Sequence, residues 1–403
     1  MKYIFLLIIF IQSFFTGNAQ TDTTTTIDSS TKVIYKVAVL APIFIDSAFN
    51  GDIFKITGNA LPRKILPGLD FYNGVMMAID SLQSEKMPLE ILFFDTKSKT
   101  LPIKKVLAQK VWDSVSLMIV SFKDRNEIKP LADFAKHKKI PLISATYPND
   151  GGVEDNPYFV LLNSSLRSHC EGIYKYIQKN HSAKNLIYIK RKGKLENDIE
   201  NIFTEMGELT PSVALKYKTV ILSDSFSTNQ LRNALDSTKN NVVICGTVNE
   251  NFGIRLVNSL TALKNYSSIA VGMPTWSGIK DFNKPSMDEI TKGIEIIYST
   301  PYNFKRGEGF GKYLTDIYRE KFYARASDWF LKGYEITYNF CHLLVKYPTD
   351  FITYLASDTT FKIFTDFNIQ PILNKNATPS IDYFENKHLY FIKKQDGAIK
   401  SIE

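Results

Sequence analysis

The sequence predicts an α/β fold made of two lobes, each built around a parallel sheet. Short apolar runs alternate along the chain with stretches in which apolar residues recur at helical spacing. This rhythm is interrupted at residues 147–152, which are rich in Pro, Asn, Asp and Gly, and then starts again. The length of 403 residues also suggests two units of ordinary domain size. All-apolar strands alternating with amphipathic helices indicate sheets covered on both faces.

The beginning of the chain has the pattern of a secretory signal. Lys2 precedes an apolar run at residues 4–15, and the small residues Gly17 and Ala19 follow it. We therefore expect residues 1–19 to be a signal peptide that is cleaved after Ala19. The alternative, a membrane anchor, would need about 20 apolar residues. A lipid anchor would need a cysteine just after the run, but the first cysteine is Cys170.

The first half of the chain follows a polar leader. Residues 20–34 are rich in Thr, Ser and Asp, so we expect them to be flexible. The apolar runs at 37–40, 91–94, 117–120 and 141–144 are the expected strands. Helical spacing marks residues 71–82, 103–111 and 132–135 as the helices between them.

The second half repeats the alternation. Strands are expected at 159–162, 186–189, 220–222, 242–244 and 269–272, with helices at 166–177, 199–206 and 231–235 between them. Residues 294–298 lead into helices at 310–317 and 336–344, and Asp396-Gly397 marks a turn between two last strands. These patterns assign residues 35–150 and 296–365 to lobe one, and residues 151–295 and 366–403 to lobe two. The chain would cross between them three times, which makes a three-strand hinge.

Motifs of common catalytic and metal sites are missing from the sequence. It contains no His-Glu-x-x-His, Cys-x-x-Cys or Gly-x-Ser-x-Gly. The Gly-rich segment 307–312 departs from a phosphate-binding loop, because Arg306 and Tyr313 stand where Gly and Ser or Thr are needed. We therefore expect no enzyme activity, no metal and no cofactor. The net charge of +8 is spread along the chain, which argues against nucleic-acid binding.

Three cysteines are too few for a disulfide-stapled domain. Cys245 lies in an apolar run and is expected to be buried. Cys170 and Cys341 fall on expected helices of different lobes. A bridge needs a Cα separation of about 5.5 Å, so we expect none between these two residues.

Several segments resemble the type I periplasmic binding proteins, the fold of amino-acid-binding components of ABC importers. Residues 36–42 with the helix at 71–80 look like that family's first βα unit, and residues 140–146 look like its Ile-Pro-x-Ile-Ser strand. Residues 271–276 and 333–336 are similar to later landmarks of a divergent bacterial-envelope branch. The resemblance covers most of the chain from residue 35 onward. It implies two Rossmann-like lobes of the periplasmic binding protein-like I class. The loop at 121–125 is charged, whereas the family usually has small residues there.

The expected ligand site follows from the sheets. In open α/β sheets, ligands bind beyond the carboxyl ends of the strands. Hydroxyls at these ends could hold a carboxylate, Glu250 an ammonium group, and aromatic faces a cation or an apolar part. The expected ligand-binding residues are Ser121, Arg125, Ser144, Thr146 and Tyr147 in lobe one, and Arg191, Thr247, Asn249, Glu250, Thr275 and Trp276 in lobe two, with Tyr302 near the crossover.

Two functions fit these features. The first is an extracytoplasmic solute-binding protein, periplasmic or secreted, that clamps an amino acid or related solute between two lobes and serves an ABC permease. The second is an envelope interaction or regulatory protein, related to the cell wall, that uses the same fold without transport. Both imply a small-molecule ligand or an envelope protein as partner, and neither implies a membrane span after cleavage.

Overall fold

Two seven-stranded sheets organise the chain in the computed structural model, which describes residues 33–56, 61–211, 213–283, 293–374 and 379–402. The expected signal peptide and the leader up to residue 32 lie outside the described residues. Both sheets belong to one compact unit that extends from Ile34 to Glu403.

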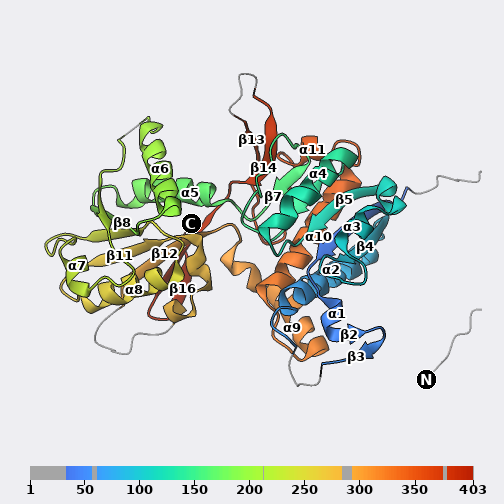
Figure 1. Ribbon diagram of the computed structural model, residues 1–403, viewed down its shortest axis with the longest axis horizontal. Helices are drawn as coiled ribbons and strands as arrows, with labels where there is room; N and C mark the ends of the chain where they lie inside the picture. Colours follow the sequence, from blue (N-terminus) through green and yellow to red (C-terminus); the bar gives the residue numbers. More distant parts are fainter. Residues whose placement is uncertain (1–32, 57–60, 212, 284–292, 375–378, 403) are drawn as a thin grey trace, which may run out of the picture. The chain divides into compact units, whose positions relative to one another are not determined.

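The first sheet has six parallel strands and one antiparallel edge strand (Figure 1). In spatial order the strands are β13 (Ile369–Leu373), β14 (Ile381–Asn386), β7 (Phe159–Leu161), β6 (Leu142–Ser144), β5 (Val115–Val120), β1 (Tyr35–Ala41) and β4 (Leu89–Asp95). β13 is the antiparallel strand and pairs only with β14 within the described chain.

The second sheet has five parallel strands followed by an antiparallel hairpin. In spatial order the strands are β16 (Ala398–Ser401), β15 (Tyr390–Gln395), β12 (Glu295–Thr300), β11 (Ser268–Gly272), β10 (Asn241–Cys245), β8 (Asn185–Lys190) and β9 (Tyr217–Ile221). The expected turn at Asp396-Gly397 joins β15 to β16, and both turn residues have positive φ angles.

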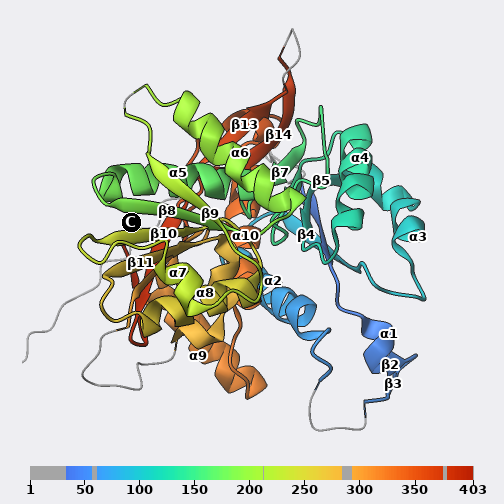
Figure 2. The same ribbon diagram turned by 60° about the vertical axis from the view of Figure 1, so that its left-hand side comes forward.

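Helices cover both faces of each sheet, as the all-apolar strands predicted (Figures 1 and 2). The first sheet is covered by α2 (Leu66–Ser84), α10 (Asp328–Lys346) and α11 (Phe351–Tyr354) on one face, and by α3 (Ile103–Leu107), η1 (Lys110–Ser114), η2 (Arg125–Glu127) and α4 (Ile128–Lys138) on the other. Alternate residues of β1 face the two layers: Val37 and Val39 pack with α2 and α10, and Ala38 and Leu40 pack with α3 and α4.

The second sheet repeats this layering. α5 (Leu166–His181) and α6 (Lys194–Glu208) lie on one face, and α7 (Thr228–Arg232), α8 (Glu250–Ala262), η3 (Pro274–Gly278) and η4 (Lys280–Asn283) lie on the other (Figure 1). Leu186 and Tyr188 of β8 pack toward α5 and α6, whereas Ile187 and Ile189 pack toward α7 and α8. The alternation of the strand separates two distinct cores.

Two glycines allow the longest helices of the first sheet to approach closely. A Cβ atom on Gly74 of α2 would lie 2.0 Å from the carbonyl oxygen of Phe330, and one on Gly333 of α10 would lie 2.2 Å from that of Phe71. Both residues belong to segments that carry the family resemblance. Helices of this kind gain dispersion contacts when no side chain holds the backbones apart.

An excursion leaves the first sheet after β1 and was not expected from the sequence. It contains α1 (Ile45–Ala48) and a small hairpin of β2 (Phe49–Asn50) and β3 (Ile53–Phe54). The hairpin strands have too few residues for periodicity to reveal them. The short helix η5 (Phe304–Gly307) and the 13-residue helix α9 (Phe310–Phe322), which contains the helix expected at 310–317, lie between β12 and α10 in the sequence.

Strand pairing differs from the expected division at each of the three boundaries. β7 pairs with β6 in the first sheet, although residues after 150 were assigned to lobe two. β12 pairs with β11 in the second sheet, although residues after 295 were assigned to lobe one. β13 and β14 belong to the first sheet, although residues after 365 were assigned to lobe two. The turn-rich segment 147–152 is a connection between two strands of one sheet, so a loop signal was mistaken for a boundary. The division into lobes itself stays a prediction.

All three cysteines are buried as free thiols, and they occupy separate packing clusters. Cys170 lies on α5, Cys245 on β10 and Cys341 on α10. Burial raises the pKa of each thiol to about 12, which keeps it protonated at neutral pH. No helix in the described part of the chain combines the length and the apolar character needed to cross a bilayer.

Candidate ligand-binding site

Three expected site residues meet at the carboxyl edge of the first sheet. Ser121 follows β5 and Thr146 follows β6, and because these strands are parallel neighbours the two hydroxyl oxygens lie 3.2 Å apart. The hydroxyl of Tyr302, which follows β12, donates to the carbonyl oxygen of Ala145 at 2.5 Å. All three side chains are buried, with exposed fractions of 1–4%.

The other expected residues of this sheet lie apart from that group. Ser144, the last residue of β6, is fully buried, and its hydroxyl has no hydrogen-bond partner among the described residues. Tyr147 is half-buried and packs against the core between the sheet and α4. Arg125 is exposed, and its Nε donates to the Asn149 side chain at 3.2 Å.

At the carboxyl edge of the second sheet, the polar residues bond to the chain itself. Thr247 is buried and donates to a carboxylate oxygen of Glu196 at 2.8 Å. Thr275 donates to the carbonyl oxygen of Val248 at 3.2 Å. Asn249 caps α8 by accepting from the amide of Phe252 at 2.9 Å. Arg191 pairs with Asp224 at 2.8 Å. Glu250, the first residue of α8, is exposed.

Trp276 does not face an open surface, in contrast to the sequence prediction. Its indole is fully buried in the core between the second sheet and α8, 5.1 Å from the ring of Phe282. It fits there because Gly253 and Gly272 have no side chains, and a Cβ atom on Gly272 would lie 2.0 Å from the indole. The position at the end of β11 was correctly inferred, but η3 turns the side chain back into the core. Its fluorescence is therefore not expected to report directly on a bound ligand.

A buried ionic cluster surrounds Tyr302 and was missed by sequence reasoning. Lys332 Nζ lies 4.2 Å and Arg306 Cζ lies 4.8 Å from the centre of the Tyr302 ring. Both cations pair with Asp328. Glu335 is completely buried and accepts from the hydroxyl of Thr365 at 3.1 Å. The signal was present in the sequence, since charged residues interrupt the apolar face of the helix at 328–346.

Burial shifts the charges of this cluster toward neutrality. Loss of solvation lowers the pKa of Lys332 well below its ordinary value and raises the pKa of Glu335. The aromatic face of Tyr302 compensates part of the lost solvation of the two cations. The cluster can therefore hold Tyr302 against the strand ends of the first sheet.

A second polar network ties together segments that cross between the sheets. The Glu385 carboxylate on β14 accepts from the amide of Ser165 and the hydroxyl of Ser168, both at 2.7 Å, and from Lys387 at 3.0 Å. On another crossing, the ring nitrogen Nδ1 of His169 lies 2.8 Å from the hydroxyl of Ser299. Burial lowers the pKa of His169 to about 3. Hydrogen bonds of buried side chains thus join the segments that follow β7, end β12 and follow β14, where the chain passes from one sheet to the other.

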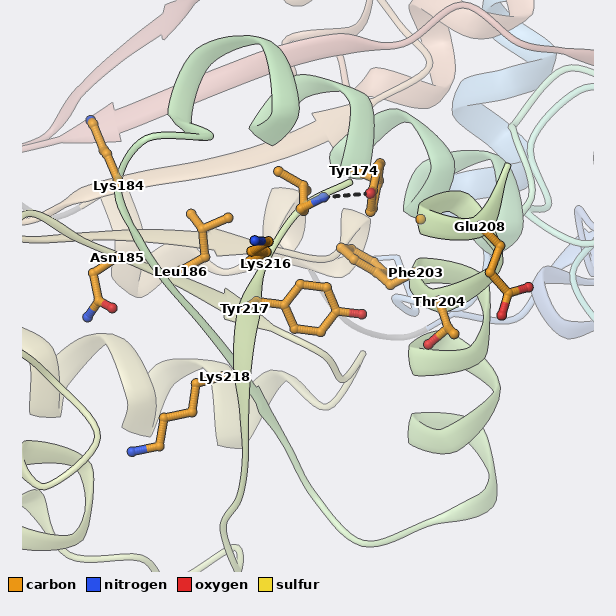
Figure 3. Close-up of a pocket in the computed structure, with 12 residues that line it drawn as sticks. Tyr174, Lys184, Asn185, Leu186, Phe203, Thr204, Glu208, Lys216, Tyr217 and Lys218 are labelled. Carbon is orange, nitrogen blue, oxygen red and sulfur yellow. Dashed lines mark hydrogen bonds between the residues drawn. The ribbon is translucent and has the colours of Figure 1, made fainter. Parts of the chain in front are cut away.

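The surface pockets lie elsewhere. Four pockets have volumes of about 500–700 Å³, and none of the four is lined by an expected ligand-binding residue. One of them is shown in Figure 3 and includes residues at the beginnings of β8 and β9, the edge opposite the strand ends. Its lysines do not converge, because Lys184 and Lys218 extend in different directions. A ligand site needs a few converging polar groups, which this pocket lacks.

Comparison with known proteins identifies the fold. No protein-family model and no curated protein matches the chain. A branched-chain amino acid ABC transporter periplasmic ligand-binding protein from Burkholderia xenovorans is similar in structure, with a TM-score of 0.62, 12% identity and coverage of 92% of this chain and 94% of that one. An ABC transporter substrate-binding protein from Desulfitobacterium hafniense in complex with Leu has a TM-score of 0.56 and 9% identity, covering 92% and 100%. The fold is that of type I periplasmic binding proteins, which confirms the prediction of fold class.

Proposed function

We propose that this protein is an extracytoplasmic solute-binding protein that closes on a small ligand at the carboxyl ends of its two parallel sheets. The observation that carries the proposal is the architecture: two sheets, joined by three crossings, with the fold of substrate-binding proteins over 92% of the chain. Crossings of this kind allow hinge closure around a ligand.

The ligand would lie between the polar residues that end the strands. The first sheet offers the paired hydroxyls of Ser121 and Thr146, and the second offers Thr247, Thr275 and Glu250. An amino acid or a related solute suits such residues, since hydroxyls bind a carboxylate and a carboxylate binds an ammonium group. Substrate-binding proteins with this fold include one solved in complex with Leu, which supports the choice of solute class.

The proposal includes export and a partner. The signal-like residues 1–19 support export of the mature protein to the periplasm or the medium. There it would deliver its solute to an ABC permease. No catalytic activity is part of the proposal.

Thermal denaturation of the mature protein with a panel of amino acids, short peptides, sugars and cell-wall fragments tests the proposal. A ligand at a hundredfold excess over its Kd stabilises the folded state by about 2.7 kcal/mol. This corresponds to an increase of a few degrees in Tm for a protein of this size. The absence of a shift with every compound in the panel would remove support for solute binding.

One observation favours a second candidate, an envelope interaction protein without transport. The hydroxyls of Thr146, Tyr302, Thr247 and Thr275 are all engaged within the chain rather than left for a ligand. A pull-down with envelope proteins and isolated peptidoglycan distinguishes the two functions. Specific capture together with an unchanged Tm in the solute panel would favour the interaction protein.

A further inference from the structure

Phe44 adopts an unusual backbone conformation at the carboxyl edge of the first sheet. It follows β1 and has φ 60° and ψ 41°, the left-handed region that a bulky residue rarely adopts. The Asp95 carboxylate at the end of β4 holds this turn by accepting the amides of Ile43, Phe44 and Ile45 at 3.0, 3.1 and 2.8 Å. The Asp95 contacts therefore hold the backbone at Phe44 in a conformation that a non-glycine residue adopts only at a cost.

Two ammonium groups lie at the ring that this turn positions. Lys123 Nζ is 4.3 Å and Lys64 Nζ is 5.4 Å from the centre of the Phe44 ring. Lys123 comes two residues after Ser121, so the group lies at the same strand ends as the hydroxyl pair. In the described chain, neither lysine has a carboxylate within ion-pair distance.

The carboxylates of this edge are already occupied. Asp95 accepts four backbone amides, including that of Lys97. Asp124 and Glu127 both pair with the Lys97 ammonium group, at 2.7 and 2.5 Å. Asp46 binds the segment at 98–100 through hydroxyls and amides. The acidic side chains therefore mainly serve the fold, and in the described chain Lys64, Lys123 and Arg125 form no direct ion pair, although Asp124 attracts Lys123 at longer range.

At the end of β8 in the second sheet, this surplus of positive charge is smaller. Of the basic residues at the end of β8, Arg191 pairs with Asp224, and Lys190 is buried and pairs with Glu200. Glu250 is exposed at the same edge. Lys192, two residues after β8, is exposed and has no ion pair within the described chain, so the second edge carries one such cation, whereas Lys64, Lys123 and Arg125 lie at the first edge with the Ser121 and Thr146 hydroxyls.

We propose that the solute carries a net negative charge and that an anionic group of it, a carboxylate or a phosphate, binds between Lys64 and Lys123 over Phe44. This inference rests on the proposed solute-binding function and narrows its ligand class. The left-handed turn at Phe44 and the unpaired lysines form a positively charged receptor that a neutral zwitterionic solute would not need. Arg125, held by Asn149, adds a third cation.

Matched probes of similar shape that differ in net charge test the proposal. Titration calorimetry of the mature protein would compare L-glutamate with L-glutamine, and succinate with succinamide; inorganic phosphate would be a fifth probe. At least one anion should bind, and its neutral partner should bind at least about tenfold more weakly, the value of one charge-assisted hydrogen bond. Binding of the anion should also weaken as salt is raised.

The double variant Lys64→Gln with Lys123→Gln should lower the affinity for the anion at least about tenfold. The control Lys104→Gln with Lys105→Gln changes the net charge equally but removes exposed lysines of α3, and it should bind like the parent. Equal loss in the control, or no loss in the test variant, would refute the assignment. Binding of neutral probes without any anion would overturn the charge inference and leave solute binding intact, whereas no binding by any probe would count against both.

Discussion

The carboxyl edges of the two sheets use similar residues in different ways. At the first sheet, the Ser121 and Thr146 hydroxyls bond to each other, and Lys64 and Lys123 have no ion pair with any described carboxylate. At the second sheet, Thr247 bonds to the buried Glu196, and Arg191 pairs with Asp224. A polar group that pairs with a charged side chain of its own chain mainly supports folding, whereas a neutral hydroxyl pair can exchange its bond for one to a ligand, and a cation without an ion pair can bind an anion. The comparison predicts that substitutions at the second edge reduce stability and that those at the first reduce binding.

The largest effect should come from the core beneath the second edge. Trp276→Ala is expected to lower the free energy of unfolding by about 3–5 kcal/mol, because it removes a fully buried indole and leaves a cavity. Denaturant unfolding measures this value. Trp276→Phe, which retains an aromatic ring, should lose clearly less. A loss below about 1 kcal/mol for the alanine variant would show that the indole is not packed as described.

Acid should destabilise the protein through His169, which is buried on α5 against Ser299 of β12. His169 has a pKa of about 3 when folded, because burial disfavours its charged form, compared with 6.5 in the ordinary state. The unfolded chain therefore binds more protons below pH 6.5, and stability is lost as the pH falls from 6.5 toward 3. The loss from this residue is about 1.4 kcal/mol per pH unit, or about 2.7 kcal/mol at pH 4.5.

The comparison variant for this effect is His169→Asn. It removes the titrating group while other acidic and basic residues remain the same. Its free energy of unfolding, measured by urea denaturation between pH 7 and 4.5, should fall less steeply than that of the parent. Parallel pH profiles for the two proteins would mean that His169 is accessible to protons in the folded state.

The buried hydroxyl of the second edge should contribute to stability. Thr247→Val keeps the shape of the side chain but removes the hydrogen bond that Thr247 donates to the Glu196 carboxylate. The free energy of unfolding should therefore fall by about 1.5–3 kcal/mol. Thr275→Val loses only a bond to a carbonyl oxygen and should cost about 1 kcal/mol. Equal costs at the two positions would contradict the role given to Glu196.

The smallest change in stability is expected at the first edge. Thr146→Val removes one of two neutral hydroxyls that bond to each other, so it should reduce the free energy of unfolding by about 1 kcal/mol or less. Affinity for a bound anion should fall about fivefold, the equivalent of one neutral hydrogen bond. Calorimetry on both Thr146→Val and Thr247→Val sharpens the comparison. A greater loss of affinity for Thr247→Val than for Thr146→Val would show that the second edge, and not the first, contributes more to binding.

Sequence patterns identified the elements that local physics determines. The strand runs at 37–40, 117–120 and 242–244 lie within β1, β5 and β10, because a strand buried on both faces must be apolar throughout. The helical spacing at 71–82 identified α2 for a similar reason. β2 has only two residues, and Gln370 and Pro371 interrupt the apolar run of β13, so neither strand was recognised. The fold class, which depends on the order of the long elements, was therefore predictable.

What the sequence alone determined is the alternation of strands and helices and the polar character of the strand ends. Only the tertiary structure decided which strands share a sheet, since pairing depends on hydrogen bonds between distant residues, as β7 and β14 illustrate. It also decided side-chain direction, which buried Trp276 and placed Lys123 over Phe44. The charge of a residue can be read from the sequence, but its partners depend on the folded chain. This is why Lys64 and Lys97, alike in sequence, differ in whether a carboxylate neutralises them.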